Sequence, residues 1–421
     1  MRQGWSVDST IAQLLNCAMN DGPAIPVFAD PLARWLVMEA YRITDTEQLV
    51  RAMGEQLVAA GIPLYRLAYF QLTLHPELAG RRYSWRRGKG AEIGPAPHGL
   101  QKQQQYLDNP LPLVFEKQKT IRARLEQTEP QAPVLRELKA EGATDYVALP
   151  LVFSTGHVDA LSVVSDRPGG FSTRDLERMY QLQFAFSRIV EIHRLRDIAV
   201  NLLDAYVGRA AGQRILAGEV KRGDGQSIEA VIWYCDLRGF TRASDRLPRD
   251  AIIALLNDYF GVMAETVTAA RGEILKFMGD AMLAMFPVPA ATERGAVAQA
   301  AIDAAGAAVK GIAALNQRRA ASGDISVRFG LALHVGEVMF GNIGASARLD
   351  FTVIGPAVNY AARLEKLTAS LERPVLVSSA LAALLPSAAL VPVGKHALKD
   401  IDAPQAVYAL PEERGEMRRS S

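Results

Sequence analysis

The chain has 421 residues, of which 49% are hydrophobic and 22% charged, and its formal net charge at pH 7 is +2. This composition is typical of a globular protein of two or three domains, and the near-neutral charge excludes an overall basic field for nucleic acid. Cys17 and Cys235, its only two cysteines, exclude a disulfide framework and a cysteine-rich zinc site. Because neither a signal peptide nor an uninterrupted apolar membrane span is visible, we expect a cytoplasmic protein.

Residues 1–171 are expected to form an α+β domain. Helical periodicity over 31–61, with Thr44 or Asp45 as a cap between two helices, precedes several strand-like segments. The turn STGH joins the last two of these segments into a hairpin. Helices followed by antiparallel strands are typical of the α+β class. The strand-like segments are 64–74, 81–87, 145–153 and 158–166.

Residues 172–226 are expected to form a linker, most of it one long helix over 172–205 that is capped by Ser172 or Thr173. Apolar side chains recur along this helix at steps of three or four, which favours pairing with the same helix of a second chain. Packing of the helix on its own domain is the alternative. The apolar positions are Leu176, Met179, Leu182, Phe186, Ile189, Ile192, Leu195, Ile198 and Leu202.

Residues 227–421 alternate between strands and helices in the manner of a ferredoxin-like βαβ fold with additions. Gly279 and Asp280 mark the turn of a first hairpin, and a second hairpin is expected within 326–344. The expected segments are a strand at 228–236, a helix at 249–272, a hairpin at 273–287, a helix at 291–320, a hairpin at 326–344, a strand at 350–355 and a helix at 356–371.

Two aspartates of this part follow strand ends. Asp236 ends an apolar strand before the sequence LRGFT, and Asp280 lies at the turn of the first hairpin. A hairpin beside the first strand brings both carboxylates together, and such a pair suits Mg²⁺ or Mn²⁺ in phosphoryl transfer. Gly239 lets backbone amides approach phosphate oxygens. Taken singly, each aspartate is better explained as an ordinary strand-end or turn residue.

Asn359 and Arg363 lie four residues apart on one expected helix and therefore share a face. A fixed amide and a guanidinium group aimed at one point suit a phosphorus centre that gains charge. In isolation, an exposed polar helix face explains the pair as well.

Three motifs in order, DLRGFT at 236–241, KFMGD at 276–280 and DFTVIGPAVNYAARLE at 350–365, resemble the catalytic domain of class III adenylyl/guanylyl cyclases. The resemblance covers about residues 225–411. It implies two divalent cations, Mg²⁺ or Mn²⁺. The resemblance implies that Asp236, Asp280 and the Leu237 carbonyl are metal ligands and that Lys276 and Thr352 contact the purine. It implies that Asn359 and Arg363 stabilise the transition state. Further substrate contacts implied by the resemblance are Gly239, Phe240, Thr241, Arg348 and Lys399 (or Lys395).

The purine contacts indicate ATP rather than GTP. Lysine is only a donor and suits N1 of adenine, and the Thr352 hydroxyl accepts from the adenine amino group. Guanine would need an acceptor such as glutamate in place of Lys276. Thr352 also resembles the subgroup that includes bicarbonate-responsive bacterial cyclases, so bicarbonate sensitivity is a hypothesis.

The resemblance further implies attack of the ribose 3′-hydroxyl on the α-phosphate of ATP, which yields cyclic AMP and pyrophosphate. In this family the metal-binding and base-reading faces come from different subunits, so a homodimer with two composite sites is implied. A dinucleotide cyclase of the GGDEF type and a degenerate nucleotide-binding module are the alternatives. The lack of a GxxxxGK[ST] sequence excludes a P-loop ATPase.

Residues 144–182 resemble the closing part of a GAF-type sensor domain, with paired strands, a Gly/Pro turn and an exit helix. This implies that residues 1–171 sense a signal, with a small-molecule effector as the candidate, and set the geometry of the cyclase dimer. Aromatic residues of this part are candidates to line a ligand pocket, although a role in the core is the simpler interpretation. They are Trp35, Tyr41, Tyr65, Tyr69 and Trp85.

Overall fold

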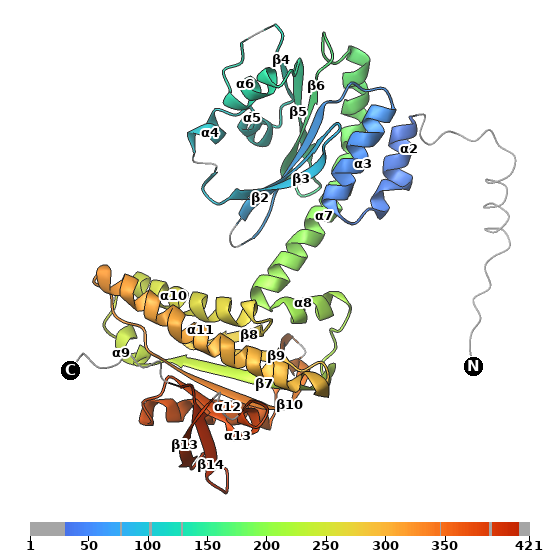
Figure 1. Cartoon of the computed structure of the whole chain (residues 1–421). Coiled ribbons are helices and arrows are strands. Elements are labelled where there is room, and N and C mark those ends of the chain that lie inside the picture. Colours follow the sequence, from blue (N-terminus) through green and yellow to red (C-terminus); the bar gives the residue numbers. More distant parts are fainter. Residues whose placement is uncertain are drawn as a thin grey trace, which may run out of the picture. The chain divides into compact units, whose positions relative to one another are not determined.

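The computed structural model divides the chain into two compact units, Met1–Asn201 and Leu202–Ser421 (Figure 1). Both combine helices with a sheet, which confirms the α+β class, whereas a GAF-like arrangement of the first unit stays a prediction. Cys17 lies outside the described residues. The structure describes residues 30–75, 78–100, 103–127, 129–345, 347–386 and 390–411.

The first unit is built on one six-stranded sheet. Its elements are α2 (Pro31–Met38), η1 (Ala40–Arg42), α3 (Thr46–Ala59), β1 (Arg66–Leu72), β2 (Leu78–Arg86), β3 (Gly90–Pro97), α4 (Gln104–Leu107), α5 (Leu111–Lys117), β4 (Ile121–Arg124), α6 (Pro133–Ala140), β5 (Asp145–Val152), β6 (Val158–Ser165) and α7 (Thr173–Tyr206). The strand order is β3-β2-β1-β6-β5-β4, and all neighbours are antiparallel.

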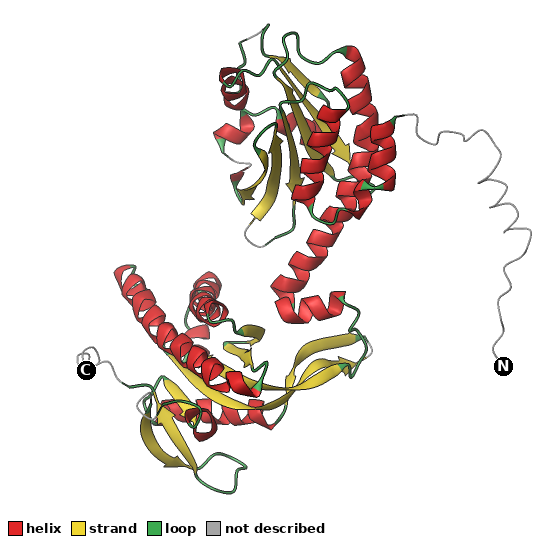
Figure 2. Cartoon of the chain, turned by 45° about the vertical axis from the view of Figure 1, so that its right-hand side comes forward, coloured by secondary structure: helices red, strands yellow, loops and turns green. Residues whose placement is uncertain are grey.

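Helices pack on both faces of this sheet (Figures 1 and 2). On one face, α2, α3 and the first part of α7 form a core with Tyr69, Trp85 and Phe186. On the other face, α5 and α6 pack through Val114 and Leu138. Tyr69 and Trp85, two of the aromatic candidates for a ligand pocket, are therefore core residues.

Two predicted helix caps are present. The Asp45 carboxylate accepts a hydrogen bond of 2.8 Å from the Gln48 amide at the start of α3. At the start of α7, the Ser172 hydroxyl accepts from the Asp175 amide at 3.2 Å, and the Asp175 carboxylate accepts from the Ser172 amide at 2.9 Å. This reciprocal pair is a capping box, which satisfies two amides that the helix itself leaves unpaired.

The apolar stripe along α7 divides into two parts with different surroundings. Met179, Leu182, Phe186 and Ile189 are buried in the core of their own unit, so the packing alternative holds for this part. The continuation of the stripe is different, because Ile192, Leu195 and Leu202 are exposed. Other large apolar side chains of α7 are exposed as well, namely Tyr180, Phe184 and Tyr206.

The second unit is built on an eight-stranded sheet. Its elements are α8 (Arg209–Leu216), β7 (Gly225–Leu237), α9 (Phe240–Ser244), α10 (Arg249–Ala269), β8 (Glu273–Met278), β9 (Ala281–Pro287), η3 (Ala291–Glu293), α11 (Arg294–Ala321), β10 (Phe329–Ala345), β11 (Arg348–Ile354), α12 (Pro356–Ser370), β12 (Val375–Ser378), α13 (Ser379–Ala382), β13 (Val391–His396) and β14 (Gln405–Ala409). The order is β13-β14-β12-β10-β7-β9-β8, and β11 pairs with β10.

Side chains alternate along β7 between two cores. Trp233 faces α10 and α11, where it packs with Tyr259 and Ile312. Ile232 faces the opposite side and packs with Phe351 and with Ala361 of α12. Since successive residues of a strand point to opposite faces, Asp236 shares the α12 side with Ile232.

The second expected hairpin is wrong. The segment 326–344 contains most of one continuous strand, β10, which pairs along β7 from Phe329 to Gly341. Gly336 does not form a turn there. A Cβ atom at this position would lie 2.8 Å from Cβ of Ala357, so the glycine lets α12 approach the strand.

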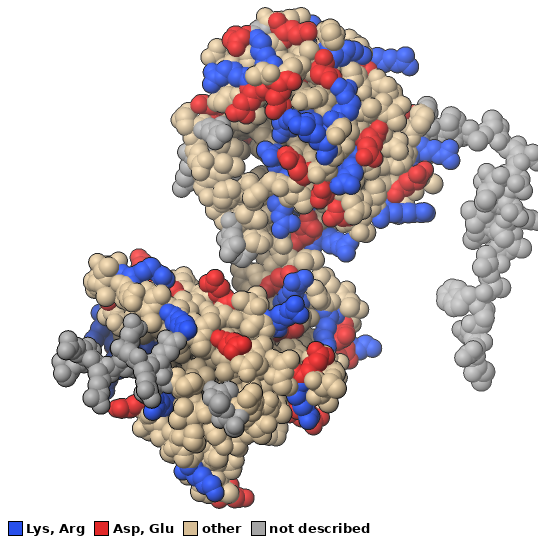
Figure 3. Space-filling view, in the orientation of Figure 1, with Lys and Arg blue, Asp and Glu red and all other residues tan. Residues whose placement is uncertain are grey.

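One helical stretch among the described residues, Ala291–Ala321, is long and apolar enough to cross a membrane by length and composition. Its alanines Ala298, Ala301, Ala305 and Ala308 are buried in the core against the sheet, as in a core helix. Charged groups of both signs are interspersed on the molecular face shown in Figure 3, in keeping with the near-neutral net charge.

Candidate active site

Asp236 and Asp280 meet at one end of the second sheet. Asp236 lies one residue before the end of β7, and its register partner on β9 is Ala281, which follows Asp280. Gly279, with a φ of 67°, forms the tight turn that presents Asp280. The structure thus brings together the two carboxylates that the sequence singles out.

The surroundings of Asp236 favour a bound cation. Burial raises the pKa of Asp236 to about 7. A hydrogen bond with Asp280 and the negative charges of Asp280 and Glu365 raise this pKa as well. Its Oδ1 atom is buried, and none of the described residues forms a hydrogen bond with it. An unpaired acceptor beside a second carboxylate is stabilised by a positive ion, and oxygen donors are those that Mg²⁺ and Mn²⁺ prefer.

The two carboxylates do not complete a metal site alone. Among the residues that the structure describes, no group of three or more His, Cys, Asp or Glu side chains is arranged to hold a metal ion. A backbone carbonyl, as implied for Leu237, water and substrate phosphates would supply the other oxygens.

The chain turns sharply after β7. Gly239 has a φ of 75°, in the left-handed region that favours glycine, and it precedes the single-turn helix α9. Phe240 is partly buried against the core of α10 and α11, which anchors the turn. Thr241 is exposed.

Lys276 and Thr352 lie on strands that are close in space. Nζ of Lys276 on β8 is 2.9 Å from Oδ2 of Asp350 on β11, two residues before Thr352 and on the same face of that strand. Thr352 is only 4% exposed, and its hydroxyl oxygen has no hydrogen-bond partner. The ion pair with Asp350 was not predicted, although the spacing within DFT could have suggested it.

Asn359 and Arg363 lie on α12. Asn359 is exposed. Nη2 of Arg363 is 3.2 Å from Oδ2 of Asp400, so this side chain has an acidic partner within its own chain. Lys399 is exposed and immediately precedes Asp400, whereas Lys395 is exposed on β13. Lys399 is therefore adjacent in sequence to the carboxylate that holds Arg363.

Arg348 is exposed at the tip of the β10–β11 hairpin, where it is the register partner of Ala345. It shares a strand with Thr352 but lies at the far end of that strand from α12.

The sequence motifs do not indicate an ion pair that lies near the two carboxylates. Nη2 of Arg238, two residues after Asp236, is 2.6 Å from Oε1 of Glu365 and also donates to the Thr368 hydroxyl. Glu365 is 2% exposed and lies on α12. A Cβ atom at Gly330 would overlap all three groups, so glycine is required there. The four-residue spacing from Ala357 to Ala361 and to Glu365 could have identified Glu365 as a charge on the apolar face of α12.

A cleft of about 590 Å³ opens between β10 and the start of α12. Its lining includes His334, Glu337, Pro356 and Tyr360. Burial lowers the pKa of His334 to about 4, and its ring stacks on Tyr360 at 4.1 Å between centroids. This histidine is therefore neutral at pH 7 and acts as a packing residue.

Most of the second unit matches a known protein family. Residues 225–410 match the family model described as the adenylate and guanylate cyclase catalytic domain. An uncharacterised protein of Mycobacterium tuberculosis is 33% identical over 217 residues, which are 51% of this chain and 38% of that protein. The adenylate cyclase of Anabaena cylindrica is 30% identical over 207 residues, which are 48% of this chain and 39% of that protein.

Among solved structures, the adenylyl cyclase CyaB from P. aeruginosa is 29% identical, with a TM-score of 0.41 over 45% of this chain and 97% of that chain. The chain spans about two fifths of the length of the two relatives named above. The family match leaves the residues before 225 without an assignment.

Proposed function

Residues 225–410 form an adenylate and guanylate cyclase catalytic domain, and from this premise we propose that the protein is an adenylyl cyclase that converts ATP to 3′,5′-cyclic AMP and pyrophosphate. The observation that carries the proposal is the paired carboxylates of Asp236 and Asp280, with one buried and unsatisfied oxygen at the end of β7. Relatives whose printed names are adenylate cyclase support the same activity.

Asp236, Asp280 and the Leu237 carbonyl would hold two divalent cations, Mg²⁺ or Mn²⁺. Such ions supply a lowered pKa for the ribose 3′-hydroxyl and neutralise charge on the phosphates. The protein contributes a rigid pair of ligands, because β7 and β9 are hydrogen-bonded neighbours that fix both aspartates.

We assign purine recognition to Lys276 and Thr352. The ammonium group of Lys276 donates to N1 of adenine, and the hydroxyl of Thr352, which has no partner among the described residues, accepts from the amino group. Asp350 restrains Lys276 through their ion pair. ATP is therefore preferred over GTP.

In the reaction, a bond forms between the ribose 3′-oxygen and the α-phosphorus, and the bond to the bridging oxygen of pyrophosphate breaks. Asn359 orients the ribose, and Arg363 stabilises the charge that develops on the α-phosphate. Lys399 contacts the leaving phosphates. Because Asp400 holds Arg363 in the single chain, substrate binding exchanges this ion pair for one with phosphate. The proton of the hydroxyl passes to water.

We propose that two copies of the chain form the active sites together, so that Asp236 and Asp280 of one copy work with Lys276 and Asn359 of the other. The exposed apolar side chains of α7 support such pairing. Ile192, Leu195, Leu202 and Tyr206 are separated by three, seven and four residues, and these spacings place them on one seam of a coiled coil.

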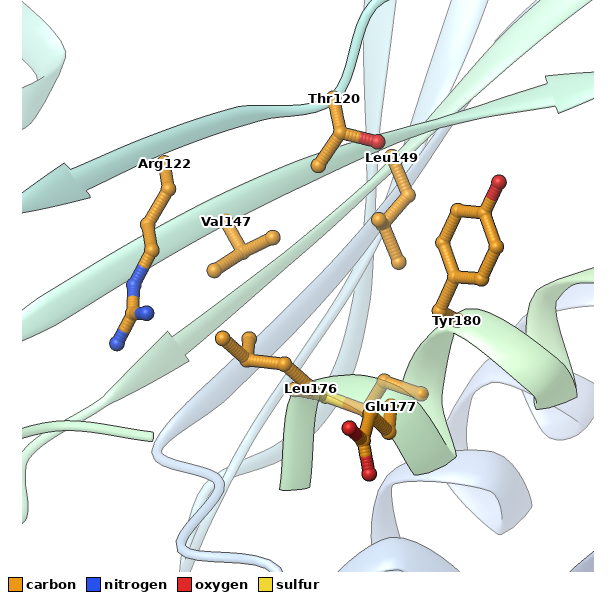
Figure 4. A pocket seen from close by; sticks show the side chains of 8 residues that line it. Thr120, Arg122, Val147, Leu149, Leu176, Glu177 and Tyr180 are labelled. Atoms are coloured by element: carbon orange, nitrogen blue, oxygen red, sulfur yellow. The ribbon is translucent and has the colours of Figure 1, made fainter. Parts of the chain in front are cut away.

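The groove beside α7 is the second feature that supports pairing. A cavity of about 270 Å³ lies between this helix and the sheet of the first unit. Figure 4 shows Val147 and Leu149 from the sheet opposite Leu176 and Tyr180 from the helix. We propose α7 of a second copy as its occupant, because Tyr180, which lines the groove, and Phe184 are exposed on this helix and their rings pack edge to face.

We also propose that the first unit regulates the second, that the protein is cytoplasmic and that bicarbonate activates it. The location follows from the use of ATP. Regulation is supported by α7, which runs from the first unit into the second without a break.

Purified protein incubated with ATP or GTP, and with Mg²⁺ or Mn²⁺, tests the activity directly when products are separated by chromatography. We expect cyclic AMP and pyrophosphate. A linear or dinucleotide product, or cyclic GMP as the main product, would contradict the proposal. Bicarbonate added to the same reaction tests the effector hypothesis.

Mixing two inactive variants tests the composite site. Asp236→Ala and Lys276→Ala chains each lose both sites as homodimers, but a mixed dimer retains one intact site. We expect cyclic AMP formation to return after the two are mixed and re-equilibrated. Mixing of Asp236→Ala with Asp280→Ala chains is the control, because both changes fall on the same half of the site and no intact site arises.

A further inference from the structure

Three arginines lie on one face of the sheet in the first unit. Along β1, Leu67 and Tyr69 point into the core beneath α2 and α3. Side chains alternate along a strand, so Arg66 points to the opposite face, and the same rule places Arg82 and Arg86 of β2 on that face. Arg66 and Arg86 are register partners across the two strands.

The charges of this cluster do not balance. Nη2 of Arg86 is 2.8 Å from Oε2 of Glu141, and Nη2 of Arg82 is 3.6 Å from Oε1 of Glu92. Among the residues described, the guanidinium group of Arg66 has no hydrogen-bond or ion-pair partner. Nε of Arg82 is also buried without a partner. Three guanidinium groups thus share two carboxylates.

The unpaired charge is costly in this position. Arg66 is partly buried, and burial lowers the pKa of its guanidinium group, as do the charges of Arg82 and Arg86. The charges of Glu141 and Glu92 raise the pKa of Arg66, but these carboxylates form ion pairs with Arg86 and Arg82. A partly desolvated cation among like charges raises the free energy of the folded state unless an anion joins it.

Small side chains separate the arginines on this face of the sheet. Ala68 and Ser84 lie directly opposite each other between them and are buried, so an anion would meet the guanidinium groups and not the sheet itself. Gly94 faces Arg82 across β2 and β3, and a Cβ atom there would lie 3.1 Å from Nη2 of Arg82. The guanidinium group of Arg82 therefore lies over this glycine.

We propose that Arg66, Arg82 and Arg86 bind a small organic anion that carries a carboxylate or a phosphate group. A guanidinium group binds either group through two parallel hydrogen bonds. The Arg86 side chain is already ordered, because its guanidinium carbon lies 5.3 Å from the ring centroid of Tyr65. The site rests on the charges of the first unit alone, so it does not depend on the proposed cyclase activity.

Isothermal titration calorimetry on the full chain, at low ionic strength, tests the site with sodium phosphate and with sodium succinate. Sodium chloride is the reference titration. Binding of one probe or both supports the proposal, and the stronger probe identifies which anionic group the site prefers. No saturable heat with either probe overturns it.

The Arg66→Gln variant should weaken binding about tenfold or more, because it removes a charge-assisted contact. Arg87→Gln is the matched control, since Arg87 follows Arg86 but pairs with Asp166 outside the cluster. It should bind as the unaltered chain does. Equal binding by the Arg66→Gln and unaltered chains overturns the assignment.

A second variant separates binding from damage to the fold. Glu92→Gln removes a carboxylate that competes for Arg82 and should tighten anion binding several-fold, which a merely destabilised fold would not do. Without added anion, Arg66→Gln should melt at the same temperature as the unaltered chain or higher, because an unpaired charge is lost. Weaker binding by Glu92→Gln would count against the proposal.

Discussion

At the scale of single residues, the proton on Asp236 controls how the chain responds to pH. A carboxyl group with a pKa of about 7 in the folded chain and 3.8 otherwise makes the folded state bind the proton more tightly. Its contribution to stability is therefore complete below about pH 4 and is lost as pH rises through about 7. A divalent cation replaces the proton and should reverse this loss.

We expect Mn²⁺ or Mg²⁺ to raise the melting temperature more at pH 8 than at pH 5.5, relative to the same protein in EDTA. Thermal unfolding followed by circular dichroism measures the difference. In Asp236→Asn, which cannot titrate, the metal effect should be small and similar at both pH values. Equal metal effects on the unaltered chain at the two pH values would contradict the role of this carboxylate.

The ion pair of Arg238 and Glu365 predicts a loss of stability from a minimal change. Glu365→Gln leaves the shape of the side chain but removes the charge that balances a partly buried guanidinium group. We expect the free energy of unfolding, measured in urea, to decrease by about 2 kcal/mol. Glu265→Gln, at an exposed position of α10, is the matched control and should change stability by less than about 0.5 kcal/mol. If both variants unfold alike, the pair does not support the fold.

Asp350 predicts a graded effect on substrate recognition. Lys276→Ala removes the donor to adenine and should lower kcat/KM for ATP by roughly 10- to 100-fold. Asp350→Asn only frees the lysine from its ion pair, so we expect a smaller decrease, of about threefold, that is carried by KM. Steady-state kinetics with ATP and GTP measure both. A larger loss in Asp350→Asn than in Lys276→Ala would refute this order.

At the scale of elements, α7 predicts the oligomeric state. Leu195 is 50% exposed on the helix seam, so Leu195→Lys should convert a dimer to monomers and abolish most cyclase activity. Light scattering after gel filtration measures the mass. Arg196→Ala, at an exposed neighbouring position, is the control and should remain dimeric. A Leu195→Lys chain that stays dimeric and active excludes this seam.

Elements with strong local signals could be predicted from sequence. The caps at Asp45 and Ser172 and the turn at Gly279 depend on residues close in the chain, and all three are present. The edge strand β3 was missed because Pro95 and Pro97 argue against a strand, yet an edge tolerates the missing amides. The hairpin expected within 326–344 was wrong because most of that segment is one continuous strand, in which Gly336 allows contact with a distant helix.

In the candidate site, too, some features could be predicted from local sequence and others could not. Asp236 with Asp280, and Lys276 with Thr352, stand in recognisable motifs, so the approach within each pair could be predicted. Partners such as Asp400 for Arg363 could not, because they depend on how separate elements pack. The same limit applied to α7, where one apolar repeat serves both a core and an exposed seam, and periodicity alone does not distinguish them.

At the scale of the whole molecule, the first unit should set the activity of the second. A chain that begins at about residue 200 retains every candidate catalytic residue but lacks most of α7. We expect it to dimerise weakly and to show a basal rate that depends steeply on protein concentration, unlike the full chain. Rates measured over a dilution series test this. Identical concentration dependence in both chains would rule out a role for the first unit.

The bond between Arg238 and Glu365 has a consequence for how two sites in a dimer behave. It ties the end of β7 that carries Asp236 to α12, and α12 also carries Asn359 and Arg363. In a composite dimer, those two side chains serve the opposite active site from the aspartates of their own chain. In such a dimer we expect cation occupancy at one site to alter catalytic groups at the other, so that the two sites fill cooperatively rather than independently.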